Sequence, residues 1–302
     1  MNKAQRELAW RIAKKLLPPD IVERLEKLPI RDTGFGYDPY GYEKETAVLG
    51  YCLTYFLYSY YFRVESRCHE RIPLQGPVIF AGNHSGVIPM DAAMQWVDLI
   101  TRPEKPLLLR AVVDNFSGFL PFVNVLFTRG GQVVGARRNF EDLLGDKEYI
   151  GVFPEGTKGL GKPYKMRYRL QNFNVGFVEL SLKYKAPIVP VATVGAEEQA
   201  PLLYNLKSVA RLLNFPYFPI TPFFPFLGPI GILPMPVKYF IEYGDPIRFY
   251  EEYGPEAIED PGLMRSLADR VRLAVQDRVD RLVEERTGIF NGGLSVDMGG
   301  GG

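Results

Sequence analysis

The pattern of apolar positions changes near residue 71. From there to residue 243, short runs rich in valine, isoleucine and aromatic residues alternate with stretches in which apolar residues recur every three or four positions. The first pattern is typical of buried strands and the second of amphipathic helices. It predicts strands at 77–81, 107–113, 131–136, 149–153, 187–194 and 237–243, and helices at 91–100, 119–127, 139–144 and 173–184. This alternation predicts an α/β fold, in which a mostly parallel sheet is covered by helices on both faces.

Two segments before residue 71 have helical character. Residues 4–17 predict a basic amphipathic helix, whose apolar arc is made of Leu8, Ile12, Ala13 and Leu16. Residues 47–62 form an uncharged, tyrosine-rich run that is shorter than the roughly 18 to 20 residues a spanning helix needs. Each segment fits either a membrane-associating helix on a lipid surface or a helix packed on the protein's own core.

The last third of the chain contains two contrasting segments. Residues 212–237 carry seven prolines and many aromatic side chains, so we expect neither a helix nor a central strand there. The segment fits a membrane-facing surface that borders an apolar groove, or a strap packed on the core. A long helix is predicted at 263–285, with Asp260 as its N-cap and Pro261 at its first position. Its apolar stripe consists of Met264, Leu267, Ala268, Val271, Val275, Val279 and Leu282.

These patterns divide the chain into three regions. Residues 1–70 are predicted to be N-terminal helices of a membrane-associating region, 71–288 an α/β catalytic domain and 289–302 a flexible tail. The first 17 residues lack the apolar core and cleavage site of a secretory signal. With 302 residues, 46% of them hydrophobic and 24% charged, the chain has the composition of a globular protein.

Charge and cysteine content exclude several classes of function. The 36 basic and 35 acidic side chains give a net charge of +1, which provides no global field for nucleic acid. Two cysteines, Cys52 and Cys68, cannot form a disulfide framework, and no Cys/His spacing matches a zinc site. We therefore expect a reducing compartment, no metal and no nucleic-acid partner.

Two polar clusters follow predicted strands, where α/β sheets place their sites. His84 lies in NHSGVIPMD, and Asp91 is the next carboxylate along the chain. A histidine held by a carboxylate can remove a proton from a hydroxyl; alternatively, His84 bonds a backbone carbonyl and Asp91 only caps a helix. In FPEGTK, Gly156, Thr157 and Lys158 are suited to a polar group such as a glycerol phosphate, although an isolated EGTK is also an ordinary turn.

A third cluster, GQVVGARRN, leads from a strand to a helix and places Arg137 at the junction. An arginine there can bind phosphate or carboxylate, or can be exposed. Downstream of FPEGTK, a run of basic residues fits either a solvated face or a surface for phosphate, a coenzyme A nucleotide or an acidic carrier protein.

The order of these motifs, with APIVPVATVG as the fourth, resembles that of the glycerolipid acyltransferases of the lysophosphatidic acid acyltransferase type. The resemblance covers about residues 77–195. It implies that His84 is the general base, that Asp91 orients it, and that Glu155, Gly156, Thr157 and Lys158 hold the acceptor. It also implies that Arg137 contacts phosphate. The acyl donor would be an acyl-CoA or acyl carrier protein thioester as co-substrate, with no other cofactor.

The resemblance implies a membrane-associated enzyme on the cytoplasmic face, peripheral or monotopic, whose acceptor is a lysophospholipid, 1-acylglycerol-3-phosphate above all. The sequence departs from the family pattern in two places. The usual spacing would put the acid at Pro89, so the loop must bulge to bring Asp91 to His84. Ala136 stands where members that use phosphate acceptors often have aspartate. A mono- or diacylglycerol acyltransferase, or a catalytically silent lipid-binding member of the fold, therefore stays an alternative.

Overall fold

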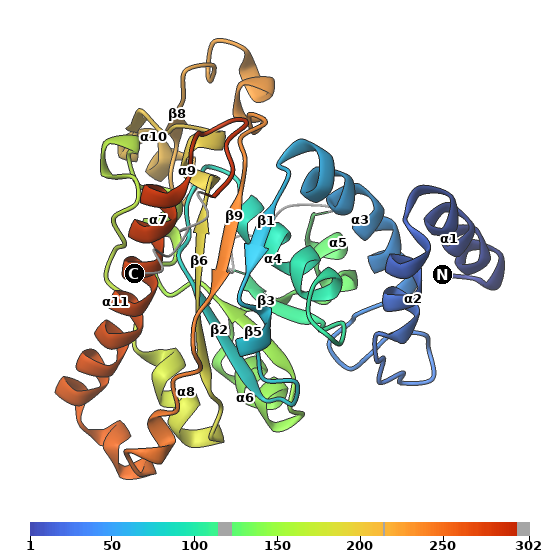
Figure 1. The fold of residues 1–302 in the computed structure, drawn as a ribbon, viewed down its shortest axis with the longest axis horizontal. Coiled ribbons are helices and arrows are strands. Elements are labelled where there is room, and N and C mark those ends of the chain that lie inside the picture. The colour runs from blue at the N-terminus through green and yellow to red at the C-terminus, as the bar shows by residue number, and fades with distance from the viewer. Residues whose placement is uncertain (114–122, 214, 295–302) are drawn as a thin grey trace, which may run out of the picture.

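The structure, a computed structural model, describes residues 1–113, 123–213 and 215–294 (Figure 1). Within these residues seven strands form one sheet in the order β1-β9-β6-β2-β5-β3-β4. The strands are β1 (Glu65–Arg67), β2 (Val78–Gly82), β3 (Leu109–Val113), β4 (Val133–Val134), β5 (Tyr149–Val152), β6 (Ile188–Val194) and β9 (Phe240–Tyr243). The five strands from β6 to β4 are parallel, and β9 pairs with β6 antiparallel and with β1 parallel. The predicted fold class is confirmed.

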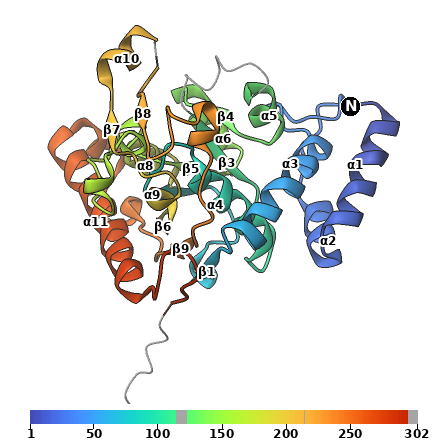
Figure 2. The ribbon, with the colours of Figure 1, turned by 90° about the horizontal axis from the view of Figure 1, so that it is seen from above.

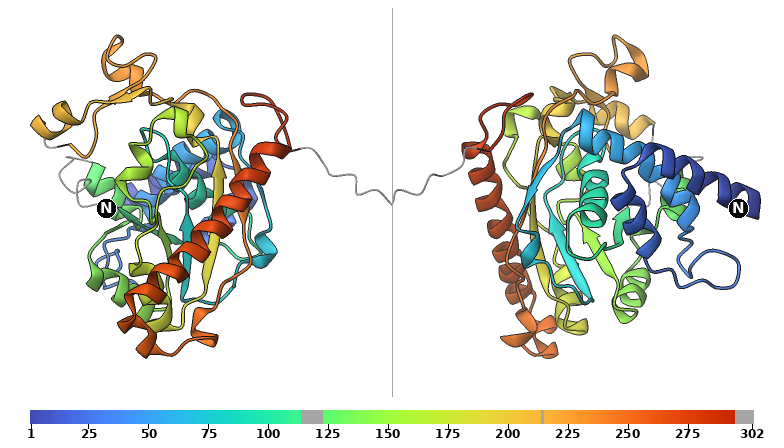
Figure 3. Two further views of the ribbon diagram at one scale, coloured as in Figure 1. Left: turned by 90° about the vertical axis from the view of Figure 1, so that its left-hand side faces the viewer. Right: turned by 45° about the vertical axis from the view of Figure 1, so that its right-hand side comes forward.

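The alternation of side chains along β2 explains why both faces of the sheet are covered. Val78 and Phe80 point to one apolar core, and Ile79 and Ala81 point to a second. The first core is covered by α1 (Lys3–Leu16), α2 (Pro19–Lys27), α3 (Lys44–Phe56) and α4 (Met90–Thr101). The second is covered by α6 (Arg137–Gly145), α8 (Gly176–Tyr184) and α11 (Pro261–Glu285). Figure 3 shows α11 on one side of the strands and α3 and α4 on the other.

Helix α11 follows its sequence pattern closely. Asp260 caps it by accepting hydrogen bonds from the N–H groups of Gly262 and Leu263, and Pro261 occupies the first position. All seven residues of the predicted stripe are buried against the sheet. The periodicity of a long, one-sided helix is therefore sufficient to identify both its span and its buried face.

The N-terminal helices belong to the same core as the sheet, because buried residues of α1, α2 and α3 contact those of β2, α4 and β9. Helix α1 buries Ala9 and Ala13, whereas Leu8 and Leu16 of the predicted stripe are 51% and 62% exposed. That stripe was only partly right: Ala13 is buried, but Ala9 completes the buried face in place of Leu8 and Leu16, because small alanine side chains let α1 lie close against α3. Helix α3 continues into a π-helix, Leu57–Tyr61. In the described part of the chain, no helix combines the length and apolar character needed to cross a membrane.

Several boundaries differ from the sequence prediction. The strand predicted at 131–136 is reduced to β4, and β1 was missed because three polar residues carry no apolar run. Of the helix predicted at 119–127, residues 119–122 lie outside the described residues, and α5 covers Val123–Arg129. The tail was predicted to start at 289. Instead, 289–294 fold back, with Arg286 and Leu294 forming an isolated bridge, while 295–302 lie outside the described residues.

Residues 203–236, here called the proline-rich arm, rise beyond the end of the sheet at which β6 ends (Figures 1 and 2). The arm contains α10 (Lys207–Leu212), a 3-10 turn and a two-stranded sheet of β7 (Tyr204–Asn205) and β8 (Pro219–Ile220). As predicted, it adds no central strand. The carboxyl ends of the neighbouring strands β6, β2 and β5 lie beside its base, so the loops that follow these three strands meet there.

Candidate active site

The loop after β2 brings the predicted histidine and carboxylate together. His84 Nδ1 lies 2.8 Å from Asp91 Oδ2, and the same oxygen accepts a hydrogen bond of 3.0 Å from the backbone N–H of Ser85. The loop bulges at Gly86, whose φ is +81° and where a Cβ would lie 2.4 Å from the carbonyl oxygen of Ala196. The bulge absorbs the two extra residues, so the unusual spacing still produces a His–Asp dyad.

Asp91 does more than start a helix. It is fully buried at the beginning of α4, and its Oδ1 accepts a hydrogen bond of 2.8 Å from the N–H of Ala92. Three donors therefore face its two oxygens, and two of the three come from the loop outside the helix. The geometry is that of a residue that orients His84, and a purely helix-capping role does not account for the contacts to residues 84 and 85.

The His84 ring is held on a second side by Phe153, which follows β5. The two rings are stacked, with centroids 4.4 Å apart and an interplanar angle of 26°. With Nδ1–H donated to Asp91, Nε2 is the ring nitrogen that can accept a proton, and His84 keeps 8% of its surface exposed. The ring is thus fixed in position while one nitrogen is left for chemistry.

Glu155 lies beneath the site, where it joins two loops. It is 3% exposed, and its two oxygens accept hydrogen bonds from the backbone N–H groups of His84 (3.0 Å) and Gln171 (2.6 Å). Burial raises the pKa of Glu155, and the charge of Lys162 together with these two hydrogen bonds acts in the opposite direction. The geometry therefore supports a role in positioning the backbone of His84 in place of the direct acceptor contact that the resemblance implies.

The rest of FPEGTK forms the start of α7 (Thr157–Leu160). Gly156 has a φ of +59° and would have no atom within 4 Å of a Cβ, so the chain leaves open space at this position. Gly159 packs against the carbonyl oxygen of His84, which a Cβ would approach to 2.4 Å. Lys158 is exposed and forms no ion pair with another described residue. Thr157 is half-buried. Open space at Gly156 and a cation at Lys158 that forms no ion pair with the described residues thus lie one and three residues from Glu155.

The guanidinium of Arg137 forms ion pairs with two carboxylates. At the start of α6 it forms ion pairs with Glu141 (3.4 Å) and with Glu179 of α8 (3.1 Å), and its side chain is 64% exposed. The structure therefore does not join Arg137 to the contacts among His84, Asp91 and Glu155. Two carboxylates would compete with a phosphate for this guanidinium.

The sequence analysis missed a cluster of buried polar residues directly after β6. Gly195, with a φ of +120°, turns the chain into α9 (Ala196–Gln199), and all four residues of α9 are buried. Glu197 forms a buried ion pair with Lys162 at 2.8 Å, and burial raises the pKa of Glu197. Two acids and a glutamine that closely follow the mostly apolar run of β6 were the signal, because charged side chains are seldom buried without a partner.

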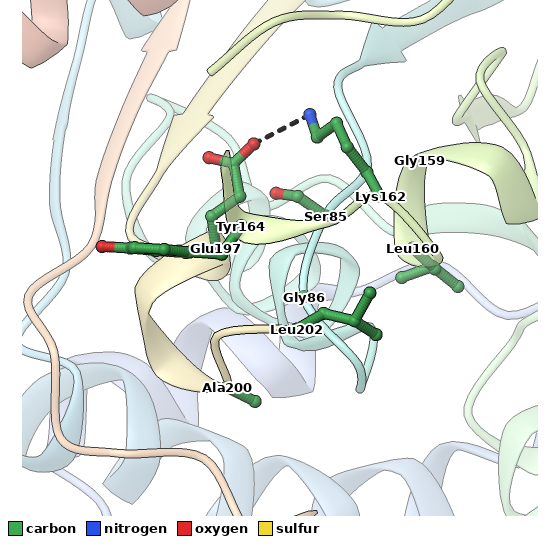
Figure 4. Close-up of a pocket in the computed structure, with 9 residues that line it drawn as sticks. All are labelled: Ser85, Gly86, Gly159, Leu160, Lys162, Tyr164, Glu197, Ala200 and Leu202. Carbon is green, nitrogen blue, oxygen red and sulfur yellow. Dashed lines mark ion pairs between the residues drawn. The ribbon is translucent and has the colours of Figure 1, made fainter. Parts of the chain in front are cut away.

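Glu197 and Lys162 also line a small, partly open pocket of about 10 Å³ beside the dyad loop (Figure 4). Ser85 borders this pocket, and its buried hydroxyl has no hydrogen-bond partner among the described residues. The pocket lies between the loop of His84, α7 and α9. The ion pair therefore holds together the segments that follow β5 and β6 on either side of His84.

A second histidine–aspartate pair joins α4, the helix of Asp91, to the segment before β2: Asp98 of α4 contacts His69. Asp98 of α4 is fully buried and accepts hydrogen bonds from four groups. The donors are Tyr58 (2.5 Å), Ser66 (2.5 Å), Tyr243 (2.7 Å) and His69 (3.1 Å). Burial alone would raise the pKa of Asp98, but the hydrogen bond and charge of His69 and the bonds from the hydroxyls hold it below its ordinary value. Asp98 thus belongs to a structural cluster that fastens β1 and β9 to α4, and it does not serve His84.

No group of three or more His, Cys, Asp or Glu residues in the described ranges could hold a metal ion. His84, Asp91 and Glu155 are committed to one another and to backbone N–H groups. The chemistry that these side chains themselves can perform is proton transfer at Nε2 of a fixed imidazole.

Comparison with known proteins places this geometry in a family. A sequence model described as Acyltransferase matches residues 63–194, which contain the first three motifs and all but the last residue of the fourth. An uncharacterized protein of Mycobacterium tuberculosis is 39% identical over 259 residues, which cover 85% of this chain and 71% of that protein. The chain belongs to the acyltransferase family. The family resemblance seen in the four motifs is thereby confirmed.

Two further similarities are consistent with this assignment. An uncharacterized protein of Mycobacterium leprae is 40% identical to this chain over 261 residues, which cover 85% of this chain and 69% of that protein. The crystal structure of the 1-acyl-sn-glycerophosphate (LPA) acyltransferase PlsC from Thermotoga maritima matches with a TM-score of 0.50 at 16% identity. The match covers 92% of this chain and 95% of that chain, and it supports the fold.

Proposed function

We propose that the protein transfers a fatty acyl group from an acyl-CoA or acyl carrier protein thioester to a hydroxyl of a glycerolipid. The observation that carries this proposal is the contact of 2.8 Å between His84 and Asp91 across a loop two residues longer than usual. Burying a carboxylate costs free energy, so a longer loop that still brings Asp91 to His84 is most simply explained by a function of the dyad. The contact also argues against a catalytically silent lipid-binding member of the fold.

In the proposed mechanism, Nε2 of His84 removes the proton from the acceptor hydroxyl. The hydroxyl oxygen attacks the thioester carbonyl carbon, and the resulting tetrahedral intermediate collapses with loss of the thiolate. The imidazolium returns its proton to the thiolate, so the products are an ester and a free thiol. Asp91 stabilises the imidazolium while it exists, and Phe153 keeps the ring in place.

For the acceptor we propose 1-acylglycerol-3-phosphate first, with Lys158 as the phosphate contact. Lys158 is exposed and unpaired within the described ranges, and it lies next to the open space at Gly156. The solved structure named above is that of a 1-acyl-sn-glycerophosphate (LPA) acyltransferase. The ion pairs of Arg137 favour the second candidate, a mono- or diacylglycerol acceptor, because they occupy the other predicted phosphate ligand.

We further propose that the enzyme works at a lipid surface as a peripheral or monotopic protein on the cytoplasmic face. The proline-rich arm supports this placement. Its exposed apolar side chains include Leu212 (84%), Phe226 (85%) and Ile230 (68%). Such a concentration of exposed apolar surface is typical of a binding surface. The basic residues of α1 would add attraction to anionic lipid, and the two weak anchors together would hold the protein at the surface.

The decisive experiment offers both thioester types and a panel of lysophospholipid, monoacylglycerol and diacylglycerol acceptors, with products identified by mass spectrometry. We expect an ester product from the wild-type protein, and a loss of about 100-fold or more in His84→Ala, the scale of a lost general base. The matched control is His69→Ala, which removes the other histidine of the chain. His69→Ala should retain its turnover per folded molecule. Absence of product with every acceptor, or near-normal turnover in His84→Ala, would overturn the proposal.

A further inference from the structure

The dyad depends on the path of the loop between its two members, and two side chains from outside the loop hold that path. The hydroxyl of Tyr217 donates a hydrogen bond of 2.6 Å to the carbonyl oxygen of Val87. The amide Nε2 of Gln199 donates one of 2.9 Å to the carbonyl oxygen of the next residue, Ile88. These are two consecutive carbonyls of the loop, between the bulge at Gly86 and the start of α4.

Gln199 is itself held firmly. Its side chain is fully buried at the end of α9, and its Oε1 accepts a hydrogen bond of 2.7 Å from Tyr239, which is also fully buried. Its backbone carbonyl accepts a further bond of 2.7 Å from the N–H of Met235. The amide that binds Ile88 is therefore oriented from the opposite side, and its Nε2 can only point at the loop.

Tyr217 belongs to the proline-rich arm, so the arm contacts the catalytic loop directly. The side chain of Val87 is buried in a small apolar cluster with Ala200 and Leu202, against which Tyr217 and Ile232 pack. Burial, and to a lesser extent the negative charge of Asp91, raise the pKa of Tyr217 to about 12. The phenol therefore remains a hydrogen-bond donor throughout the physiological pH range.

From these contacts we infer that Tyr217 and Gln199 are positioning residues of the acyltransferase reaction, which hold the lengthened loop so that Asp91 meets His84. The inference rests on the proposed function of the dyad. Neither residue touches the reacting atoms; each acts through a backbone carbonyl of the loop. A loop with two extra residues has more conformations available than a shorter one, and the two external hydrogen bonds restrict them.

The inference predicts a specific kinetic signature for Tyr217→Phe, which removes the hydroxyl and keeps the ring. We expect kcat to fall about tenfold or more, because a displacement on the order of 1 Å can cost about 100-fold. The KM for the thioester should stay within about twofold. Gln199→Met should show the same pattern with a larger loss of thermal stability, since it also leaves the Tyr239 hydroxyl without its acceptor.

The matched control is Tyr204→Phe, which removes the hydroxyl of an exposed tyrosine (65%) on the same arm. It should leave kcat and KM unchanged. Equal kcat in Tyr217→Phe and Tyr204→Phe, or a loss in Tyr217→Phe that matches only its unfolded fraction by circular dichroism, would overturn the inference. Inactive wild-type protein, or active His84→Ala, would instead overturn the proposed function on which the inference rests.

Discussion

Replacing Asp91 by asparagine separates the charge of this residue from its shape. In one rotamer the amide oxygen takes the place of Oδ2 and still accepts from His84 and Ser85, while the NH2 group faces the N–H of Ala92. In the other rotamer the NH2 group faces the N–H of Ser85 and forces His84 into the tautomer with hydrogen on Nε2. The first rotamer creates a single donor–donor contact at the edge of a helix, so we expect it to prevail and the fold to be kept.

Asp91→Asn should therefore lose activity without losing much stability. The His84 ring keeps its tautomer, but the imidazolium formed during proton transfer no longer faces a negative charge. The scale of general-base catalysis predicts a fall in kcat of about 100- to 10,000-fold, or about 3 to 5 kcal/mol of transition-state stabilisation. Continuous detection of the released thiol measures kcat, and differential scanning calorimetry measures the melting temperature.

Asp98→Asn is the matched variant, since it makes the same change at a second buried aspartate of α4. Its amide would keep the bonds from Tyr58 and Ser66 but face His69 and the Tyr243 hydroxyl with a donor. Charged hydrogen bonds contribute about 1.5 to 3 kcal/mol each, so the loss of these two should cost about 3 to 6 kcal/mol in unfolding free energy. At about 2 °C per kcal/mol for a chain of this size, the melting temperature would fall by about 6 to 12 °C.

The stability difference between wild type and Asp98→Asn should depend on pH in one direction. The pKa of Asp98 is lowered in the folded protein, so its contribution is complete above the unfolded value of about 3.9. It is lost as the pH falls further through the folded value. The difference in melting temperature should therefore be largest near neutral pH and shrink below about pH 4.

The two variants together can refute the assignment. If Asp91→Asn keeps kcat within about threefold of wild type but melts several degrees lower, Asp91 acts as a structural residue and the dyad mechanism fails. If Asp98→Asn loses kcat per folded molecule as severely as Asp91→Asn, the separation of the two clusters is incorrect.

Two further predictions concern the lipid surface and the acceptor. The double variant Phe226→Ser/Ile230→Ser should keep the melting temperature of the wild type, because both side chains are exposed. It should no longer sediment with anionic vesicles. Unchanged sedimentation would show that the arm does not bind lipid. Lys158→Ala should raise the KM for a lysophosphatidic acid acceptor about fivefold, corresponding to roughly 1 kcal/mol for an exposed charge pair. Arg137→Ala should raise this KM less, since Glu141 and Glu179 already form ion pairs with Arg137. A strong preference of the wild-type enzyme for monoacylglycerol would contradict phosphate binding at this site.

Strong, periodic patterns in the sequence were sufficient to predict the fold. The largely apolar runs of β2 and β6 and the one-sided apolar stripe of α11 favour burial, so the type and approximate span of these elements follow from the sequence. Strand β1 could not be predicted, because its three residues are polar and depend on pairing with β9 from the far end of the sequence. The buried face of α1 was predicted only in part, since Ala13 is buried but close packing favoured Ala9 over the larger Leu8 and Leu16.

The sequence was sufficient to identify the residues of the candidate site whose type the chemistry restricts. It was not sufficient to predict which partners each residue contacts in the folded chain. His84 and Asp91 stand out because a histidine after a strand and a nearby acid have few structural uses in combination. The backbone role of Glu155 could not be read from FPEGTK, because its hydrogen-bond partners lie 71 and 16 residues away. The ion pairs of Arg137 likewise join α6 to α8, which nothing in the local sequence indicates.

The pairing of β1 with β9 sets the order in which the chain can complete its fold. Arg67 and its partner Glu242 are separated by 175 residues, so β1 has no neighbour until most of the polypeptide has been synthesised. The hydrogen bond between Asp98 and the Tyr243 hydroxyl of β9 likewise cannot form until β9 has been synthesised. Contacts this distant in sequence form late and slow the final step of folding. Helices α2 and α3 can already pack on α4, but β1 joins the sheet only through the C-terminal part of the chain, so a nascent protein that stops before residue 240 would hold β1 without its partner strand.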